Sequence, residues 1–145
     1  MRLTNYTDYS LRMLIYLGSM KEDKLTSIQE IADAYQISKN HLMKVAHELG
    51  KKGYIETIRG RNGGMRLSKL PKDINIGKVI RSTEEDFNLV ECFDSERNAC
   101  IISPACHLKH VLHEALSAYF EVLDGYTLAD LIVNDHKLRQ LLFKH

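Results

Sequence analysis

Two short amphipathic stretches with a tight connection constrain the fold of this chain more than any other feature. Residues 27–35 begin with Ser27 and place Glu30 three positions later, which is the spacing of a helix-capping box. Residues 38–52 start with Ser38, a good helix cap, repeat apolar side chains at helical spacing, and precede Gly53, a typical helix terminator. The pair predicts the centre of a helix-turn-helix unit.

The segments on either side extend this unit. Residues 5–20 carry apolar side chains at helical spacing, including Leu11, Leu14 and Ile15. Residues 54–58 and 65–68 have strand-like composition or alternation around the glycine-rich turn RGRNGG, which predicts a β-hairpin with a basic tip. We therefore predict a mainly α fold, with a winged helix-turn-helix DNA-binding domain over residues 1–82.

A long apolar stripe occupies the last third of the chain. Ser103 and Pro104 are typical of a helix start and Gly125 of a helix end, so we predict one helix of about 20 residues. Its apolar face, from Leu108 to Val122, needs a partner. We expect a second copy of the same helix, which makes residues 104–145 the dimerisation helix and C-terminal helices of a homodimer. The alternative is that residues 127–143 fold back and cover the stripe.

Positive charge is concentrated in one segment, although the whole chain has a formal charge of +1. Residues 39–72 contain nine Lys or Arg and two Glu, a local charge of +7, so the remainder carries −6. This pattern predicts double-stranded DNA as a partner, with a solvated basic face as the alternative. In a winged helix the third helix meets base edges and the wing meets phosphates or a minor groove. The predicted DNA contacts are Ser38, Lys39, Asn40, His41, Lys44, Lys51, Arg59, Arg61 and Asn62.

All three cysteines, Cys92, Cys100 and Cys106, fall in one polar loop. Their C-x7-C-x5-C spacing lacks the close C-x2-C pair of a structural zinc site, whereas iron–sulfur clusters accept widely spaced thiolates. His107 and His110 follow the loop, so a zinc site with three cysteines and one histidine stays open as an alternative. Thiols that sense oxidation directly, or that simply pack, are two further alternatives.

Several classes of protein are disfavoured. The chain lacks H-E-x-x-H, G-x-S-x-G, a Walker loop and G-x-G-x-x-G, so we do not expect an enzyme. No apolar run is long enough to span a bilayer and nothing resembles a signal peptide. We therefore expect a cytoplasmic protein without a membrane partner, and an odd cysteine count argues against a disulfide framework.

These features together resemble the iron–sulfur winged-helix transcriptional repressors. The resemblance covers nearly the whole chain: the opening MRLTNYTDYSLRMLIYL, the capped helices, RGRNGGMRL, the three-cysteine loop and the long helix. Within that family TDYSLR is similar to the nitric-oxide-sensitive branch. In the cluster-biogenesis branch a histidine three residues after the third cysteine is the fourth ligand, and Lys109 occupies that position here.

The resemblance implies a function and a ligand set. Cys92, Cys100 and Cys106 would bind an iron–sulfur cluster within a loop of residues 83–107, and Asp8 would be the fourth ligand, donated by the other subunit. A 4Fe–4S cluster is favoured over 2Fe–2S, and nitric oxide would destroy it and release a dimeric repressor from promoter DNA. By position alone Asp8 is also an ordinary acidic residue near a helix start, and His107 and His110 remain alternative ligands. The first two cysteines lie farther apart than is usual in the family, and two extra loop residues cost little entropy.

Overall fold

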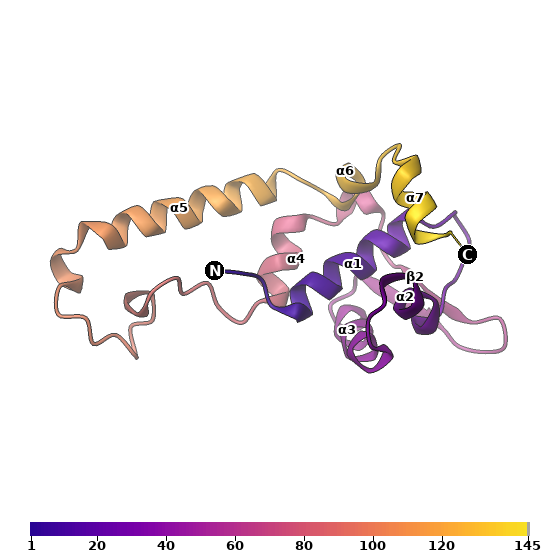
Figure 1. The fold of residues 1–145 in the computed structure, drawn as a ribbon, viewed down its shortest axis with the longest axis horizontal. Helices are drawn as coiled ribbons and strands as arrows, with labels where there is room; N and C mark the ends of the chain where they lie inside the picture. The colour runs from indigo at the N-terminus through magenta and orange to yellow at the C-terminus, as the bar shows by residue number, and fades with distance from the viewer. Residues whose placement is uncertain (145) are drawn as a thin grey trace.

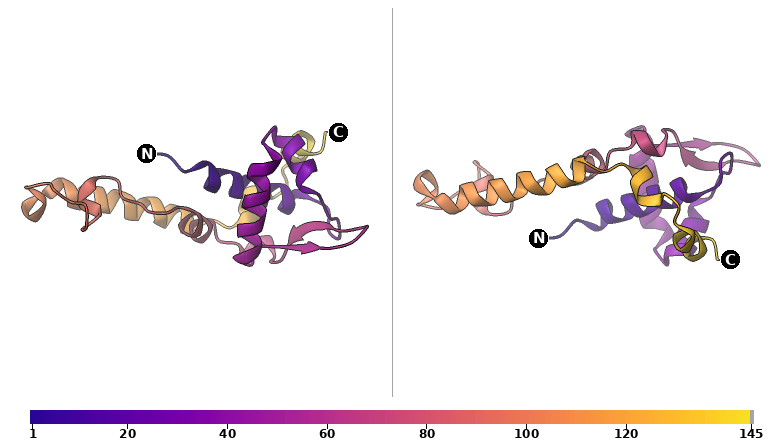
Figure 2. Two further views of the ribbon diagram at one scale, coloured as in Figure 1. Left: turned by 90° about the horizontal axis from the view of Figure 1, so that it is seen from below. Right: turned by 90° about the horizontal axis from the view of Figure 1, so that it is seen from above.

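The computed structural model describes residues 1–144 as a winged unit from which one long helix projects (Figure 1). Figure 2 shows the same separation from two further directions, with the hairpin and the long helix at opposite ends. The elements are α1 (Asn5–Ser19), α2 (Ile28–Tyr35), α3 (Lys39–Lys51), β1 (Ile55–Ile58), β2 (Gly64–Leu67), η1 (Pro71–Asp73), α4 (Ile76–Thr83), η2 (Glu91–Phe93), η3 (Ser103–Ala105), α5 (His107–Asp124), α6 (Leu128–Ile132) and α7 (His136–Leu142).

Helix α1 lies at the centre of the winged unit. It packs against α3, α4 and α6, and Met13 and Leu14 have no exposed surface. The side chain of Thr4 caps its start by accepting the backbone N–H of Thr7. Because this helix is enclosed along its second half, its position determines where the other helices lie.

The helix-turn-helix forms where the caps and apolar spacing predict it. Ser27 accepts the N–H of Glu30 at the start of α2. The capping box is only half formed, because the Glu30 carboxylate accepts a hydrogen bond from the Thr26 hydroxyl at 3.0 Å instead. Gln36 takes a left-handed conformation, with φ of 56°, and this turns the chain between α2 and α3.

The predicted hairpin is a two-stranded antiparallel sheet, with register running from Ile55–Leu67 to Ile58–Gly64. Backbone hydrogen bonds between Thr26 and Met65 attach the sheet to the segment before α2. A Cβ on Gly64 would lie 2.8 Å from the Thr26 carbonyl oxygen, so this close approach requires glycine. The wing is therefore fixed to the helical core at its base, and its tip projects.

The long helix begins later than the sequence predicts. Ser103–Ala105 forms a separate 3₁₀ turn, and α5 starts at His107. Cys106 is the N-cap residue rather than part of the first turn, because its backbone is extended, with φ of −84° and ψ of 114°. Neither α5 nor another helix within residues 1–144 is long and apolar enough to cross a membrane.

The C-terminal helices pack on the winged unit and leave α5 uncovered. Leu128 of α6 is fully buried against α1, and the Phe143 ring meets Tyr16 edge-on at 5.1 Å between centroids. The alternative in which residues 127–143 cover the apolar stripe is therefore wrong. On α5, Leu108, Val111 and Val122 remain 57–61% exposed. Residues 1–144 therefore leave much of this stripe uncovered.

Replacing Leu128 with alanine tests whether α6 belongs to the core of the winged unit. Leu128→Ala should lower the free energy of unfolding by about 2–5 kcal/mol, because it removes a fully buried side chain. The matched control is Leu131→Ala, since Leu131 lies in the same helix and is 39% exposed. Urea denaturation measures both, and an equal or larger loss for the control would contradict this packing.

Candidate cysteine site and DNA-binding surface

The three cysteines lie in the segment that returns the chain to the start of α5 (Figure 1). Cys92 is in η2, Cys100 precedes η3 and Cys106 is the N-cap of α5; all three are half-buried free thiols. Within residues 1–144, no three His, Cys, Asp or Glu side chains converge closely enough to hold one metal ion. The thiols therefore lie on separate turns of one loop.

Asn98 organises the second half of this loop. Its side-chain oxygen accepts the N–H of Cys100 at 3.0 Å, and its amide nitrogen donates to the Ser103 hydroxyl at 2.8 Å. One side chain thus links Cys100 to the turn that ends at Cys106. No side-chain hydrogen bond caps the start of α5, and Cys106 occupies its N-cap position, beside the free N–H groups of the first turn.

A ring contact holds the first half of the loop against α5. The Phe93 ring stacks on His113 with 3.9 Å between centroids and an interplanar angle of 2°. Phe93 follows Cys92 directly, so this stack fixes where the first cysteine enters the loop. Both ends of the cysteine segment are thereby attached to the same helix.

The donor set suits an iron–sulfur cluster. Three thiolates are soft ligands, and N–H groups at a helix start stabilise negative sulfur. Ile101 and Ile102, which follow Cys100 directly, are 93% and 58% exposed, so apolar side chains border this part of the loop. Because the thiols sit on a surface loop, they can close around a group larger than one ion.

Asp8 is not brought to the cysteines within one chain. It lies in the first turn of α1, whereas the start of α5 is at the far end of the molecule (Figures 1 and 2). Its carboxylate instead pairs with Arg12 at 2.9 Å, and both side chains are 43% exposed. The i, i+4 spacing of the two residues was a sequence signal for this pair, although sequence reasoning missed Arg12.

Arg12 connects Asp8 through aromatic side chains to α3, the helix predicted to read the bases and called the recognition helix below. Its guanidinium lies 5.8 Å from the Tyr9 ring and 5.9 Å from the Tyr35 ring. Tyr9 in turn stacks on His41 of α3, with 6.2 Å between centroids. The Tyr35 hydroxyl donates to the Arg12 carbonyl at 2.7 Å, and burial raises the pKa of Tyr35 to about 12. The candidate ligand is therefore three contacts away from a candidate DNA-contacting residue.

The predicted DNA-contacting residues are all exposed. Ser38, Lys39, Asn40, His41 and Lys44 occupy the start of α3, whose opposite face is buried through Leu42 and Val45. Ser38 makes no side-chain capping hydrogen bond, so its hydroxyl is not used by the helix.

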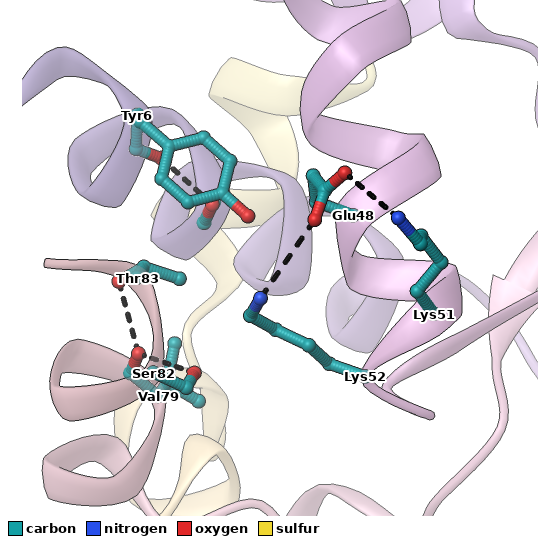
Figure 3. A network of polar contacts seen from close by, with 8 residues as sticks. Tyr6, Glu48, Lys51, Lys52, Val79, Ser82 and Thr83 are labelled. Atoms are coloured by element: carbon teal, nitrogen blue, oxygen red, sulfur yellow. Dashed lines mark hydrogen bonds and ion pairs between the residues drawn. The ribbon is translucent and has the colours of Figure 1, made fainter. Parts of the chain in front are cut away.

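The remaining candidates lie at the end of α3 and on the wing. In Figure 3, Lys51 and Lys52 both reach Glu48, at 3.5 and 3.9 Å, and the Lys51 side chain is still 63% exposed. The wing residues Arg59, Arg61 and Asn62 lie between the two strands at the tip of the hairpin. The exposed basic residues thus lie on two elements, α3 and the tip of the hairpin.

Glu84 attaches the start of α1 to the segment that leads into the cysteine loop. Its carboxylate accepts hydrogen bonds from the Thr4 N–H at 3.0 Å and from the Thr7 hydroxyl at 2.7 Å. Partial burial alone would raise the pKa of Glu84, but these hydrogen bonds outweigh it and lower the pKa below the ordinary value of 4.5. The first turn of α1, which contains Asp8, is held by this contact.

The sequence comparison decides the family. Residues 3–134 match the sequence model of the family described as Rrf2, iron-dependent transcriptional regulator. The chain belongs to the Rrf2 family. Over 142 residues it is 66% identical to the HTH-type transcriptional regulator NsrR of Bacillus licheniformis, covering 98% of this chain and 99% of that protein. The protein of the same description from Bacillus subtilis is 61% identical over 98% of this chain and 97% of its own length.

Solved structures agree with the Rrf2 fold. CymR, described as the global cysteine regulator of B. subtilis, has a TM-score of 0.72 and 27% identity, over 93% of this chain and 98% of that one. IscR of T. potens has a TM-score of 0.73 at 24% identity, over 91% and 86% of the two chains, and shows the fold alone. The predicted fold class and the family resemblance are confirmed, and this Rrf2 protein is a transcriptional regulator similar to NsrR, not an enzyme.

Acid should remove the contribution of Glu84 to the stability of this Rrf2 protein. A lowered folded-state pKa means that the contribution is present above the unfolded value near 4.5 and is lost as pH falls through the folded value. Glu84→Gln should lower the free energy of unfolding at about pH 7 by less than about 1 kcal/mol, and by progressively less as the pH falls below about 4.5. Urea titrations test this with Glu85→Gln as control, and a difference that persists in acid would contradict it.

Proposed function

We propose that this chain is a dimeric, promoter-binding repressor that senses nitric oxide through an iron–sulfur cluster. The observation that carries the proposal is the position of the three thiols. They lie at the start of a projecting apolar helix whose other end packs on α4 of the winged unit. A group bound at that loop is thus connected through α5 both to the proposed dimer surface and to the winged unit.

Dimerisation is supported by the uncovered face of α5. Its apolar residues are half-buried or exposed, and none of the eighteen residues of α5 is fully buried. A helix with so broad an apolar face is stable in water when another apolar surface covers it. A second copy of α5 satisfies this need symmetrically and places two recognition helices on one duplex.

Cys92, Cys100 and Cys106 would hold the cluster, and Asp8 of the partner subunit would complete it. A cluster bound there supplies iron atoms with which nitric oxide reacts. Three thiolates and one carboxylate favour the 4Fe–4S form, because each iron of the cubane takes one protein ligand. A carboxylate is a hard ligand beside soft thiolates, so Asp8 would be the weakest of the four attachments.

Arg12 gives Asp8 an alternative partner when the cluster is lost. In this structure the Asp8 carboxylate is already held by Arg12, whose side chain also lies near Tyr9 and Tyr35. Ligation and ion pairing compete for the same carboxylate, so a change at Asp8 alters the charge that Arg12 meets. Because Tyr9 stacks on His41, that change reaches the start of α3. A coupling of about 1–3 kcal/mol between the two sites would change DNA affinity by roughly 5–150-fold.

DNA binding in the presence and absence of nitric oxide tests the proposed function directly. Anaerobically purified protein should contain iron and sulfide, absorb in the visible range, and bind a duplex that it selects from a randomised library. Stoichiometric nitric oxide should remove the visible bands and weaken binding of that duplex together, by about 5-fold or more.

Three results would contradict this account. Colourless protein with stoichiometric zinc would indicate a zinc site. Equal DNA binding after iron chelation would indicate direct sensing by thiols. Loss of the visible bands with unchanged affinity would separate the cluster from DNA binding.

Asn40 and Arg61 should affect DNA binding in different ways. Asn40 at the start of α3 is placed to pair with a base, so Asn40→Ala should cost about 1–3 kcal/mol on the selected duplex and relax its sequence preference. Arg61 on the wing is placed to meet phosphate, so Arg61→Ala should reduce the slope of log affinity against log salt by about one unit. Lys137→Ala, in α7, is the control, because it removes one positive charge as Arg61→Ala does. If all three variants changed the affinity and the salt dependence equally, this surface would be excluded as the DNA-binding surface.

A further inference from the structure

The junction between the winged unit and α5 is built from contacts that reach across long sequence separations. Arg81 near the end of α4 binds Asp124, the last residue of α5, through both guanidinium nitrogens, with 3.0 Å between Nη2 and Oδ2. Its guanidinium carbon also lies 4.1 Å from the centroid of the Phe120 ring. One arginine therefore contacts two successive turns of α5, and bidentate pairs of this kind restrict geometry as well as adding energy.

Backbone and cap contacts fix the same junction from the other side. The Asn75 side chain caps α4 and also donates to the Asp124 carbonyl at 2.8 Å. The N–H of Ile76 donates to the Tyr126 carbonyl at 3.0 Å, and the N–H of Leu128 donates to the Ile74 carbonyl at 2.8 Å. The chain that leaves α5 is thus held beside the start of α4 by three hydrogen bonds.

Gly77 allows the two helices to approach this closely. It is buried, and a Cβ at this position would lie 1.8 Å from Asp124 Oδ1 and 3.1 Å from Arg81 Nη1. The 1.8 Å distance is far shorter than any real contact between these atoms, so even alanine would displace the carboxylate. The space beside Gly77 is therefore the space that the Arg81–Asp124 pair occupies.

We propose that Arg81, Asp124 and Gly77 form a joint that sets the angle of α5 to the winged unit and thereby the half-site spacing that a dimer reads. The inference rests on the dimer in the proposed function. α5 has 18 residues and is about 27 Å long, so a tilt of about 10° moves its far end by about 5 Å. That exceeds one base-pair step of about 3.4 Å. A small change in the angle at the joint thus changes the distance between the two recognition helices by more than one base-pair step.

Operators with altered spacing test this joint in the full-length dimer. The probe is the duplex that wild-type protein selects from a randomised library, together with versions that have one or two base pairs added or removed between the half-sites. Wild-type protein should prefer the parent spacing over a one-base-pair change by about 10-fold or more. Gly77→Ala and Arg81→Gln should reduce that ratio to about 3-fold or less, because each displaces or removes the paired carboxylate.

Three controls separate positioning from simple destabilisation. Lys78→Gln removes one positive charge from the same helix at an exposed position, and should keep the wild-type spacing ratio. Arg81→Lys keeps the charge but not the paired contacts, and should behave like Arg81→Gln. Urea denaturation, sedimentation and affinity for a single half-site confirm that each variant is folded, dimeric and able to read bases.

Folded, dimeric Gly77→Ala and Arg81→Gln proteins with the wild-type spacing ratio would overturn the joint and leave the proposed function intact. A wild-type protein that stays monomeric on DNA would overturn the dimer, and the joint with it. If Gly77→Ala does not fold, the two Arg81 variants decide the question alone, because Arg81 is 42% exposed and its replacement leaves no cavity in the core.

Discussion

Met13 and Leu14 of α1 have no exposed surface, and the helix that carries them packs against α3, α4 and α6. Close-packed interiors transmit displacement because they contain few voids. The same helix carries Asp8 and Tyr9 at its other end, where Tyr9 stacks on the recognition helix through His41. A group that binds or releases the start of α1 therefore acts on a helix whose second half is packed in the core.

The molecule combines this packed helix with a cysteine loop at the surface. The cysteine segment is attached to α5 by the Phe93–His113 stack at one end and by the N-cap position of Cys106 at the other. Between these attachments its thiols are half-buried and lie on separate turns. The proposed cluster would therefore be bound by a surface loop, whereas the helix-turn-helix is held by buried core residues.

Local sequence signals predicted most of the fold. Ser27, Gly53 and the hairpin turn mark element boundaries through capping and backbone conformation, which depend on neighbours in sequence. The start of α5 was placed three residues too early, because Ser103 and Pro104 also suit a 3₁₀ turn and the extended conformation of Cys106 leaves no local signature.

Contacts between distant residues could not be predicted in the same way. Glu84 with Thr4, Arg81 with Asp124, and Tyr9 with His41 join residues that are 32 to 80 positions apart. A single sequence, taken by itself, contains no signal for such pairs. The candidate cysteines were found from their spacing in one polar loop and from the family resemblance, which also implied Asp8 of the other subunit. The ion pair of Asp8 with Arg12 was missed, although its i, i+4 spacing is a local signal.

Mixed dimers test the central claim most directly, which is that one cluster joins the cysteines of one subunit to Asp8 of the other. Co-expression with two affinity tags isolates a dimer of an Asp8→Ala chain with a chain in which Cys92, Cys100 and Cys106 are all serine. The account predicts about one cluster per mixed dimer, retaining iron against an anaerobic chelator as the wild-type protein does. Iron that is lost from the mixed dimer as fast as from the Asp8→Ala homodimer would contradict it.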